Sequence, residues 1–256
     1  MRIIFILARH TLKELIRKKD FYVFIILFIS LSVFLYNETF FGVEGISRYL
    51  KEIGFSLIML FSMIIAVTFS AKQIPSELDS KTVYPLLAKP VSRTELILGK
   101  FAGSVLISFI TFTVFFALYL GFIFSKGEGA GYALMAQSYL FSMLLLVLLS
   151  SISVFFSQIL TVSANVTIVF ILYFSIYWYN GVLRDLLTSQ TQKFAYLYGI
   201  LYYILPHFEF YDTRIRLVHL WDPMPLWVVT AVTVYTVIYA GLVIWGACGI
   251  FRRKNL

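Results

Sequence analysis

The sequence has few charged residues and a large excess of apolar ones. Asp, Glu, Lys and Arg make up 13% of its 256 residues, and apolar residues make up 60%. Soluble domains carry about 25% charged and about 45–50% apolar residues. A soluble fold of this length has no use for so much apolar surface, so lipid must be the solvent for much of the chain. Because the apolar blocks are spread evenly, we expect a single membrane domain with no soluble domain attached.

Cysteine is nearly absent, because Cys248 is the only one. A single cysteine excludes a disulfide within the chain, and the sequence has no Cys/His spacing typical of a zinc site. Cys248 lies in the last apolar segment, and we interpret it as a small buried apolar side chain.

Motifs for catalysis and nucleotide binding are missing as well. Neither an HExxH nor a GxSxG pattern occurs. The only candidate for a phosphate-binding loop is Gly99-Lys100. Thr94 stands where the first glycine of such a loop belongs, and Phe101 stands where Ser or Thr belongs. We therefore predict that the chain is not an enzyme and binds no cofactor or metal of its own.

Six apolar segments have roughly the length needed to cross a hydrocarbon core of ~30 Å. They are Phe21–Tyr36, Ile53–Ala71, Phe101–Phe124, Ala133–Phe156, Ile159–Tyr179 and Leu226–Ile250. Only Ser157 and Gln158 separate the fourth segment from the fifth, which predicts a tight hairpin. The expected fold is an all-α integral membrane protein with six transmembrane helices.

Basic residues are distributed unevenly around these segments. Fourteen of the 21 Lys and Arg residues precede the first segment, follow the sixth, or lie between the second and third. This bias places both termini in the cytoplasm. The net charge of +8 then reflects membrane topology. Nucleic acid is not an expected partner, because no basic soluble module with interleaved aromatic residues is present.

Residues 1–20 carry apolar and basic side chains at helical spacing. Ile4, Ala8 and Leu12 fall on one side of a helix, and basic residues fall on the other. The basic side includes Arg9, Lys13 and Arg17. Such a helix lies in the membrane interface with its basic face toward anionic lipid headgroups. The alternative is a cytoplasmic tail that only fixes the orientation of the chain.

The predicted outer loop Asn180–Pro225 is unusually apolar. Phe194–Leu205 is aromatic and too short to span, which favours a re-entrant or interfacial helix. A second short helix is expected at about Thr213–Leu220. The loop also contains His207 and His219, but its His, Asp and Glu residues match no metal-ligand spacing. We interpret these residues as part of a solvated loop.

The six segments contain no Asp, Glu, Lys, Arg or His. Proton-coupled transporters keep ionisable residues inside the membrane, so this absence argues against proton coupling. Energy must then come from elsewhere, or the chain is a passive pore or scaffold. Thr161, Asn165 and Thr167 open the fifth segment, where they either pack helices together or line a substrate path.

The inner loop at residues 72–100 is amphipathic. Pro75 suits a helix start, with Glu77 and Asp79 in the first turn, where the helix dipole favours acidic residues. Ser92 can cap a new helix that leads into the third segment. We expect a short helix across the cytoplasmic mouth, ready for a soluble partner. The alternative is a simple surface connector.

Three stretches resemble the ABC-2 type permeases, the membrane subunits of ATP-binding-cassette transporters. They are the amphipathic start Ala8–Asp20, the inner loop Glu77–Lys100, and an ending built from Leu205–Phe208, Val218-His219 and Ile250–Lys254. The order of the apolar segments and the overall length also fit, so the resemblance covers nearly the whole chain.

The resemblance implies a type V exporter-like transmembrane domain in a bacterial or archaeal cytoplasmic membrane. Two permease subunits would form a homodimer or heterodimer in lipid, each on a cytoplasmic ATPase subunit that binds ATP and Mg. Residues 1–20 would be the elbow helix, and the second and fifth segments would line the substrate path. The inner loop would be the coupling helix that docks on the ATPase, through Ile74, Pro75, Glu77, Leu78, Lys81, Thr82, Leu86 and Leu87. The alternative function is an assembly or signalling subunit that uses the same machinery mechanically, without moving a substrate.

Overall fold

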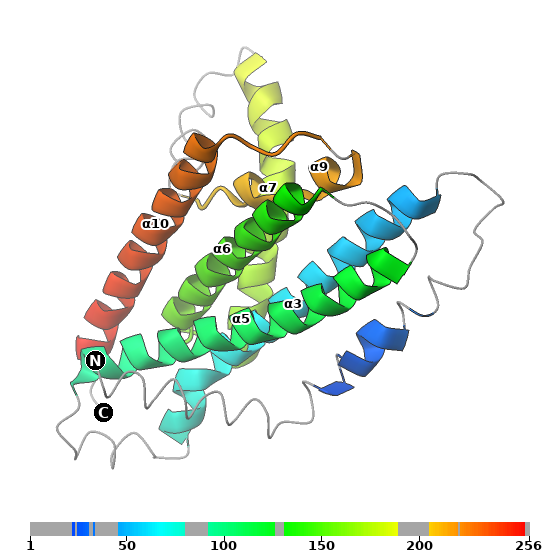
Figure 1. Ribbon diagram of the computed structural model, residues 1–256. Coiled ribbons are helices and arrows are strands. Elements are labelled where there is room, and N and C mark those ends of the chain that lie inside the picture. The colour runs from blue at the N-terminus through cyan, green and yellow to red at the C-terminus, as the bar shows by residue number, and fades with distance from the viewer. Residues whose placement is uncertain are drawn as a thin grey trace.

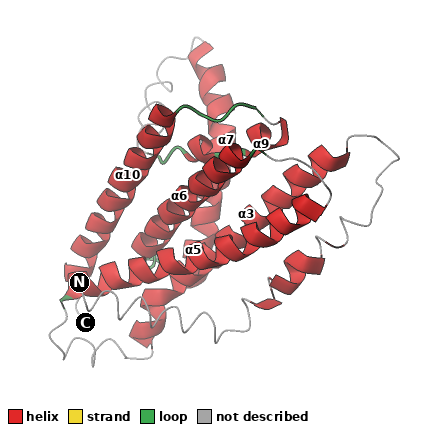
Figure 2. Cartoon of the chain, in the orientation of Figure 1, coloured by secondary structure: helices red, strands yellow, loops and turns green. Residues whose placement is uncertain are grey.

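The computed structural model describes residues 22–23, 25–30, 33, 46–79, 92–125, 131–188, 205–219 and 221–253. Within this part of the chain every regular element is a helix (Figures 1 and 2). The elements are α3 (Ile46–Asp79), α5 (Arg93–Ser125), α6 (Tyr132–Phe156), α7 (Val162–Thr188), the 3-10 helix η2 (Phe208–Tyr211), α9 (Arg214–His219) and α10 (Leu226–Arg253). The predicted all-α fold is therefore confirmed for the described residues.

Four helices are long and apolar enough to cross a membrane. Their candidate spans are Glu52–Leu78, Arg93–Gly121, Tyr132–Phe156 and Leu226–Arg253. They coincide with the second, third, fourth and sixth segments predicted from the sequence. The fifth segment corresponds to α7, whose described apolar stretch Val162–Ser175 is shorter. The first segment is described only at residues 22–23, 25–30 and 33, which are helical but form no continuous span, so two of the six predicted spans stay predictions.

Helix α6 lies at the centre of the bundle, where it packs against α3, α5, α7 and α10. Helix α3 also packs against α5 and α7, and α10 also packs against α5. Figure 1 shows α5 and α10 close together at one end and diverging toward the other. We call the end that carries Arg93, Lys100, Arg252 and Arg253 the basic end of the bundle. At this end Arg93 Nη1 donates to the carbonyl oxygen of Arg252 at 3.0 Å, which joins the start of α5 to the last turn of α10.

Serine side chains fill much of the space between the helices. Gln73 Nε2 of α3 donates to Ser104 Oγ of α5 at 2.7 Å. Ser108 Oγ of α5 lies 3.3 Å from Ser150 Oγ of α6. Small residues let helix backbones approach closely, and their hydroxyls form the hydrogen bonds that lipid cannot supply. The helix contacts are therefore both close and polar.

The predicted hairpin between the fourth and fifth segments is confirmed. Helix α6 ends at Phe156, a turn follows, and α7 begins at Val162. Asn165 is fully buried and donates its side-chain amide to the carbonyl oxygen of Ser153 at 2.9 Å. Ser153 Oγ in turn donates to the carbonyl oxygen of Val67 in α3 at 3.0 Å. One polar chain thus connects α7, α6 and α3.

A second polar contact lies at the opposite end from the basic residues. Gln137 of α6 donates its amide to the carbonyl oxygen of Met224, and its own carbonyl oxygen accepts from the Met224 amide, both at 2.8 Å. The side chain therefore satisfies both backbone groups of one residue just before α10 begins. This pairing joins the first turns of α6 to the start of α10.

The prediction of a helix start at Pro75 is wrong, and the inner loop is shorter than expected. Helix α3 continues through Pro75 and ends at Asp79, while α5 begins at Arg93, so both ends of the region 72–100 belong to long helices. Ile74 is only 2% exposed and packs in a cluster with Leu96 and Phe251. Burial of such side chains stabilises the last turns of α3 and outweighs the hydrogen bond that the proline ring removes.

The predicted cap at Ser92 is confirmed. Glu95 donates its backbone N–H to Ser92 Oγ at 3.2 Å, and Ser92 donates its backbone N–H to Glu95 Oε2 at 2.9 Å. This reciprocal arrangement is the capping box, which satisfies backbone donors left open at a helix start. Helix α5 therefore begins at a position set by its own sequence.

An ion pair between Glu77 and Lys100 joins α3 to α5 at the basic end. Lys100 is only 4% exposed. A buried ammonium group without a partner is costly, so the carboxylate must stay close to it. Glu77 is one of the residues predicted for the docking surface, and Lys100 is the last residue of the predicted inner loop.

Glu77→Gln is expected to lower the free energy of unfolding by about 3 kcal/mol, because it leaves the Lys100 ammonium buried without its carboxylate. The double variant Glu77→Gln/Lys100→Met removes both charges and should recover most of this loss. Denaturant unfolding of the full chain in detergent measures both effects. Glu52→Gln, the same change at an exposed position of α3, should alter stability by less than about 0.5 kcal/mol. A double variant as unstable as Glu77→Gln would contradict the ion-pair argument.

Candidate functional site

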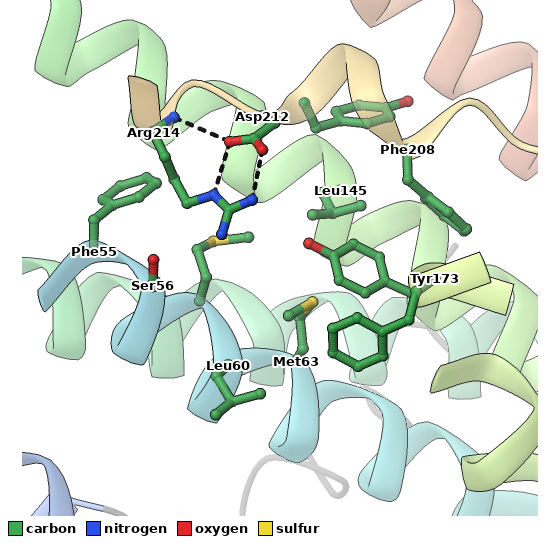
Figure 3. A pocket seen from close by; sticks show the side chains of 12 residues that line it. Phe55, Ser56, Leu60, Met63, Leu145, Tyr173, Phe208, Asp212 and Arg214 are labelled. Carbon is green, nitrogen blue, oxygen red and sulfur yellow. Dashed lines mark hydrogen bonds and ion pairs between the residues drawn. The ribbon is translucent and has the colours of Figure 1, made fainter. Parts of the chain in front are cut away.

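A pocket of about 200 Å³ lies between α3, α6, α7 and the segment at residues 205–219 (Figure 3). Helix α3 supplies Phe55, Ser56, Met59, Leu60 and Met63. These positions recur at spacings of three to four residues, so they share one face of the helix. The face that α3 turns toward α7 is therefore aromatic and rich in methionine.

The opposite wall of the pocket comes from α7 and η2. Tyr173 of α7 and Phe208 of η2 lie with their ring centroids 5.5 Å apart. Tyr211 of η2 hydrogen-bonds through its hydroxyl to Thr236 Oγ1 of α10 at 2.7 Å. Burial raises the pKa of Tyr211 above the ordinary value of a phenol, so its hydroxyl keeps its proton even in alkaline solution. The hydroxyl contact joins the short helix that closes the pocket to α10.

One ion pair borders the pocket. Arg214 donates Nε to Asp212 Oδ1 at 2.9 Å and Nη2 to Asp212 Oδ2 at 2.6 Å. Asp212 Oδ1 also accepts the backbone N–H of Arg214 at 3.1 Å, which fixes the turn into α9. Figure 3 shows both side chains above Phe55 and Ser56 of α3. The two charges cancel, so the pocket gains a polar rim without a net charge.

The side chains that line the pocket suit an apolar ligand. Methionine and aromatic side chains adapt to irregular shapes, and apolar pockets with a few polar groups are typical binding sites. Within the described residues no group of three or more His, Cys, Asp and Glu side chains is arranged to hold a metal. Ligand pockets usually enclose about 300–1,000 Å³, so this pocket is smaller than a typical ligand site.

The residues predicted to line a substrate path do not line this pocket. Asn165 is fully buried and bonded to Ser153, which places it between packed helices. Thr167 is exposed and donates its hydroxyl to the carbonyl oxygen of Ser163 in its own helix at 2.9 Å. Thr161 is exposed at the start of α7. The polar character of the three positions did not indicate the cavity.

The predicted ATPase-coupling residues fall into two groups. Ile74 is buried, Pro75 and Leu78 are half-buried, and Glu77 is paired with Lys100. The remaining predicted positions lie outside the described residues: Lys81, Thr82, Leu86 and Leu87 of the inner loop, and Arg9, Lys13 and Arg17 of the elbow helix. Most of the predicted interfacial helix Phe194–Leu205 also lies outside them. The short helix predicted at Thr213–Leu220 is observed as α9.

Charged and strongly polar residues do not mark this pocket in the sequence, because most of its lining is aromatic or apolar. A usable signal was present in the second apolar segment. Phe55, Met59 and Met63 recur every fourth residue there, and they place large adaptable side chains on one helix face.

Comparison with known proteins identifies the family. A family profile described as ABC-2 family transporter protein matches residues 5–245, which is nearly the whole chain. A comparison with curated proteins returns no match. The apolar helices agree with the membrane subunit that this family supplies to an ABC transporter. The chain belongs to the ABC-2 family of transporter proteins.

Proposed function

We propose that this chain is one of two permease subunits of an exporter, driven by a separate cytoplasmic ABC ATPase. The family match along residues 5–245 carries this proposal, because it identifies a permease of the ABC-2 type. The sequence adds two supporting observations. It has no phosphate-binding loop, and its predicted spans have no ionisable residue to couple transport to protons. ATP and Mg would then bind to the partner subunit.

The basic end of the bundle is suited to receive force from an ATPase. Glu77 and Lys100 join α3 to α5, and Arg93 joins α5 to the backbone of α10. Three helix ends are therefore connected by charged groups rather than by apolar contact alone. Residues 80–91, which contain Lys81, Thr82, Leu86 and Leu87, connect two of these ends in sequence. A displacement of that segment would act on α3, α5 and α10 together.

Helix α3 would carry the displacement to the pocket. Glu77 and Met59 lie on the same helix, 18 residues apart, which corresponds to about 27 Å along its axis. The pocket has α3 on one wall and α7 on the other, so a shift of α3 would change its shape. A second permease subunit would complete the cavity, which in one chain is small. Thr161, Asn165 and Thr167 would then support α7 rather than contact the substrate.

Association with an ABC ATPase is the first test of the proposed function. The chain should co-purify with an ABC ATPase and show no ATPase activity alone. The double variant Leu86→Asp/Leu87→Asp should uncouple ATP hydrolysis from transport and weaken ATPase binding, because it places two charges on the proposed docking segment. The unfolding midpoint should stay unchanged. Leu256→Asp, on the same predicted side, serves as the control, and normal ATPase binding by the double variant would contradict the docking assignment.

Cysteine labelling tests the movement of α3 without knowledge of the substrate. In a Cys248→Ser background, Ser56→Cys should react with a membrane-impermeant maleimide added outside, because Ser56 lines the pocket. Ser163→Cys is exposed at the basic end and should not react from that side. Addition of ATP to the complex with the ATPase should change the labelling rate of Ser56→Cys severalfold. If ATP gives the same labelling rate with an active and with an ATPase-dead partner, the movement of α3 is not coupled to ATP hydrolysis. If the movement is coupled but no substrate is transported, the result favours a mechanical assembly or signalling role.

A further inference from the structure

A groove of about 670 Å³ runs along α10, where that helix faces α5 and α6. It shares no lining residue with the pocket between α3 and α7. Its base includes Phe101 of α5 and Val147 of α6, and its α10 side includes Gly241 and Gly249. The volume falls within the ~300–1,000 Å³ that ligand sites occupy. The groove is therefore large enough for a molecule that the transport pathway does not explain.

Two glycines keep the groove open. A Cβ atom added at Gly241 or at Gly249 would meet nothing within 4 Å. Trp245 lies between them in sequence, lines the groove and is 78% exposed. At Gly241 and Gly249 the helix surface is bare backbone, with one large aromatic ring between the two positions. In a membrane, a flexible acyl chain can lie against such a surface and gain dispersion contacts along its length.

The groove ends at two arginines. Arg252 and Arg253 both line it, both are exposed, and none of the lining residues is acidic. Arg252 donates Nε and Nη2 to Thr94 Oγ1 of α5 at 3.2 and 3.0 Å, which holds its guanidinium group beside the groove. Among the described residues neither arginine forms an ion pair with a carboxylate. The positive charge at this end is therefore available to an anion.

The length of the groove matches one leaflet of a bilayer. Val237 and Arg252 both line it and lie 15 residues apart on α10, which corresponds to about 22 Å along the helix. Half of a bilayer that measures ~40–45 Å with its headgroups is about the same length. An acyl chain that follows the glycines would bring its headgroup to the two arginines.

We propose that this groove binds one anionic phospholipid, with its phosphate on Arg252 and Arg253 and an acyl chain along Gly241 and Gly249. Charge decides against two other occupants. Residues 1–20 carry six basic and two acidic side chains, so this segment would bring further positive charge to the arginines. A second copy of α10 packed in parallel would place its own Arg252 and Arg253 beside them. An anionic lipid headgroup instead neutralises both guanidinium groups.

Trp245 provides the probe, because bromine on an acyl chain quenches tryptophan fluorescence on contact. The full chain is reconstituted in vesicles of zwitterionic phospholipid that contain increasing fractions of a brominated anionic phospholipid. A parallel series contains a brominated zwitterionic phospholipid. The difference in fluorescence between the unaltered chain and Trp245→Phe isolates the signal of Trp245 from the other three tryptophans. We expect about 25-fold preference for the anionic lipid, which corresponds to ~1 kcal/mol for each arginine.

Two sets of variants separate the headgroup contact from the acyl contact. Arg252→Gln/Arg253→Gln should abolish the preference, and Arg252→Lys/Arg253→Lys should retain most of it. Gly241→Leu should raise the lipid fraction needed for half-quenching severalfold. Gly121→Leu is the matched control, because Gly121 is also helical, exposed and free of neighbours within 4 Å of an added Cβ.

Four results would overturn the proposal. Equal quenching by the two brominated lipids would mean that only bulk lipid reaches Trp245. A preference that persists in Arg252→Gln/Arg253→Gln would place the headgroup elsewhere. Identical behaviour of Gly241→Leu and Gly121→Leu would place the acyl chain outside the groove. An absence of quenching by either lipid would mean that a protein segment or a second copy covers the groove.

Discussion

Lipid supplies no hydrogen bonds, and this constraint determines how the helices of this permease are held together. Every backbone group inside the bilayer must be satisfied within a helix, and every buried side-chain donor or acceptor needs a protein partner. Serines, one asparagine and two glutamines placed between helices supply part of these hydrogen bonds, while other buried atoms such as Ser138 Oγ and Ser142 Oγ have no partner among the described residues. Asn165, Ser153 and the Val67 carbonyl form one such connection, and Gln73 with Ser104 forms another.

The same constraint explains the only buried ion pair among the described residues. Glu77 and Lys100 lie at the basic end, where α3 and α5 reach the edge of the predicted membrane region. At the bilayer centre these charges would be far more costly. At the helix ends they hold two long helices in a fixed relation. This location of the ion pair agrees with the proposed mechanism, in which an ATPase acts on the basic end and α3 carries the displacement to the pocket.

Composition and periodicity predicted the membrane class, four of the spans, the hairpin after α6, the cap at Ser92 and the short helix α9. These features depend on local sequence, such as apolar length or a capping residue followed by Glu95. The error at Pro75 has a different origin. Proline favours a helix start locally, but the burial of Ile74 against α5 and α10 extends α3 past it. Local signals could not show which distant residues cover that turn.

The candidate pocket was even harder to predict from the sequence than the course of α3 at Pro75, because tertiary structure brings its walls together. Its α3 face could be read from the spacing of Phe55, Met59 and Met63, but its other walls come from α6, α7 and residues 205–219. Nothing in the sequence pairs Tyr173 with Phe208, or Tyr211 with Thr236. Asn165 illustrates the opposite case, because its polarity suggested a substrate path while its contact with Ser153 belongs to helix packing.

The pairing of Gln137 with both backbone groups of Met224 has a mechanical consequence. It connects α6 to the start of α10, far from the point where Arg93 connects the end of α10 to α5. Helix α10 is thus bonded to α6 just before its first residue and to α5 in its last turn. These two contacts resist sliding of α10 along α5 and α6, so a displacement that begins at the basic end would move α10 together with those helices. The outward surface of α10 would then keep its shape through the transport cycle, which is what a bound lipid requires.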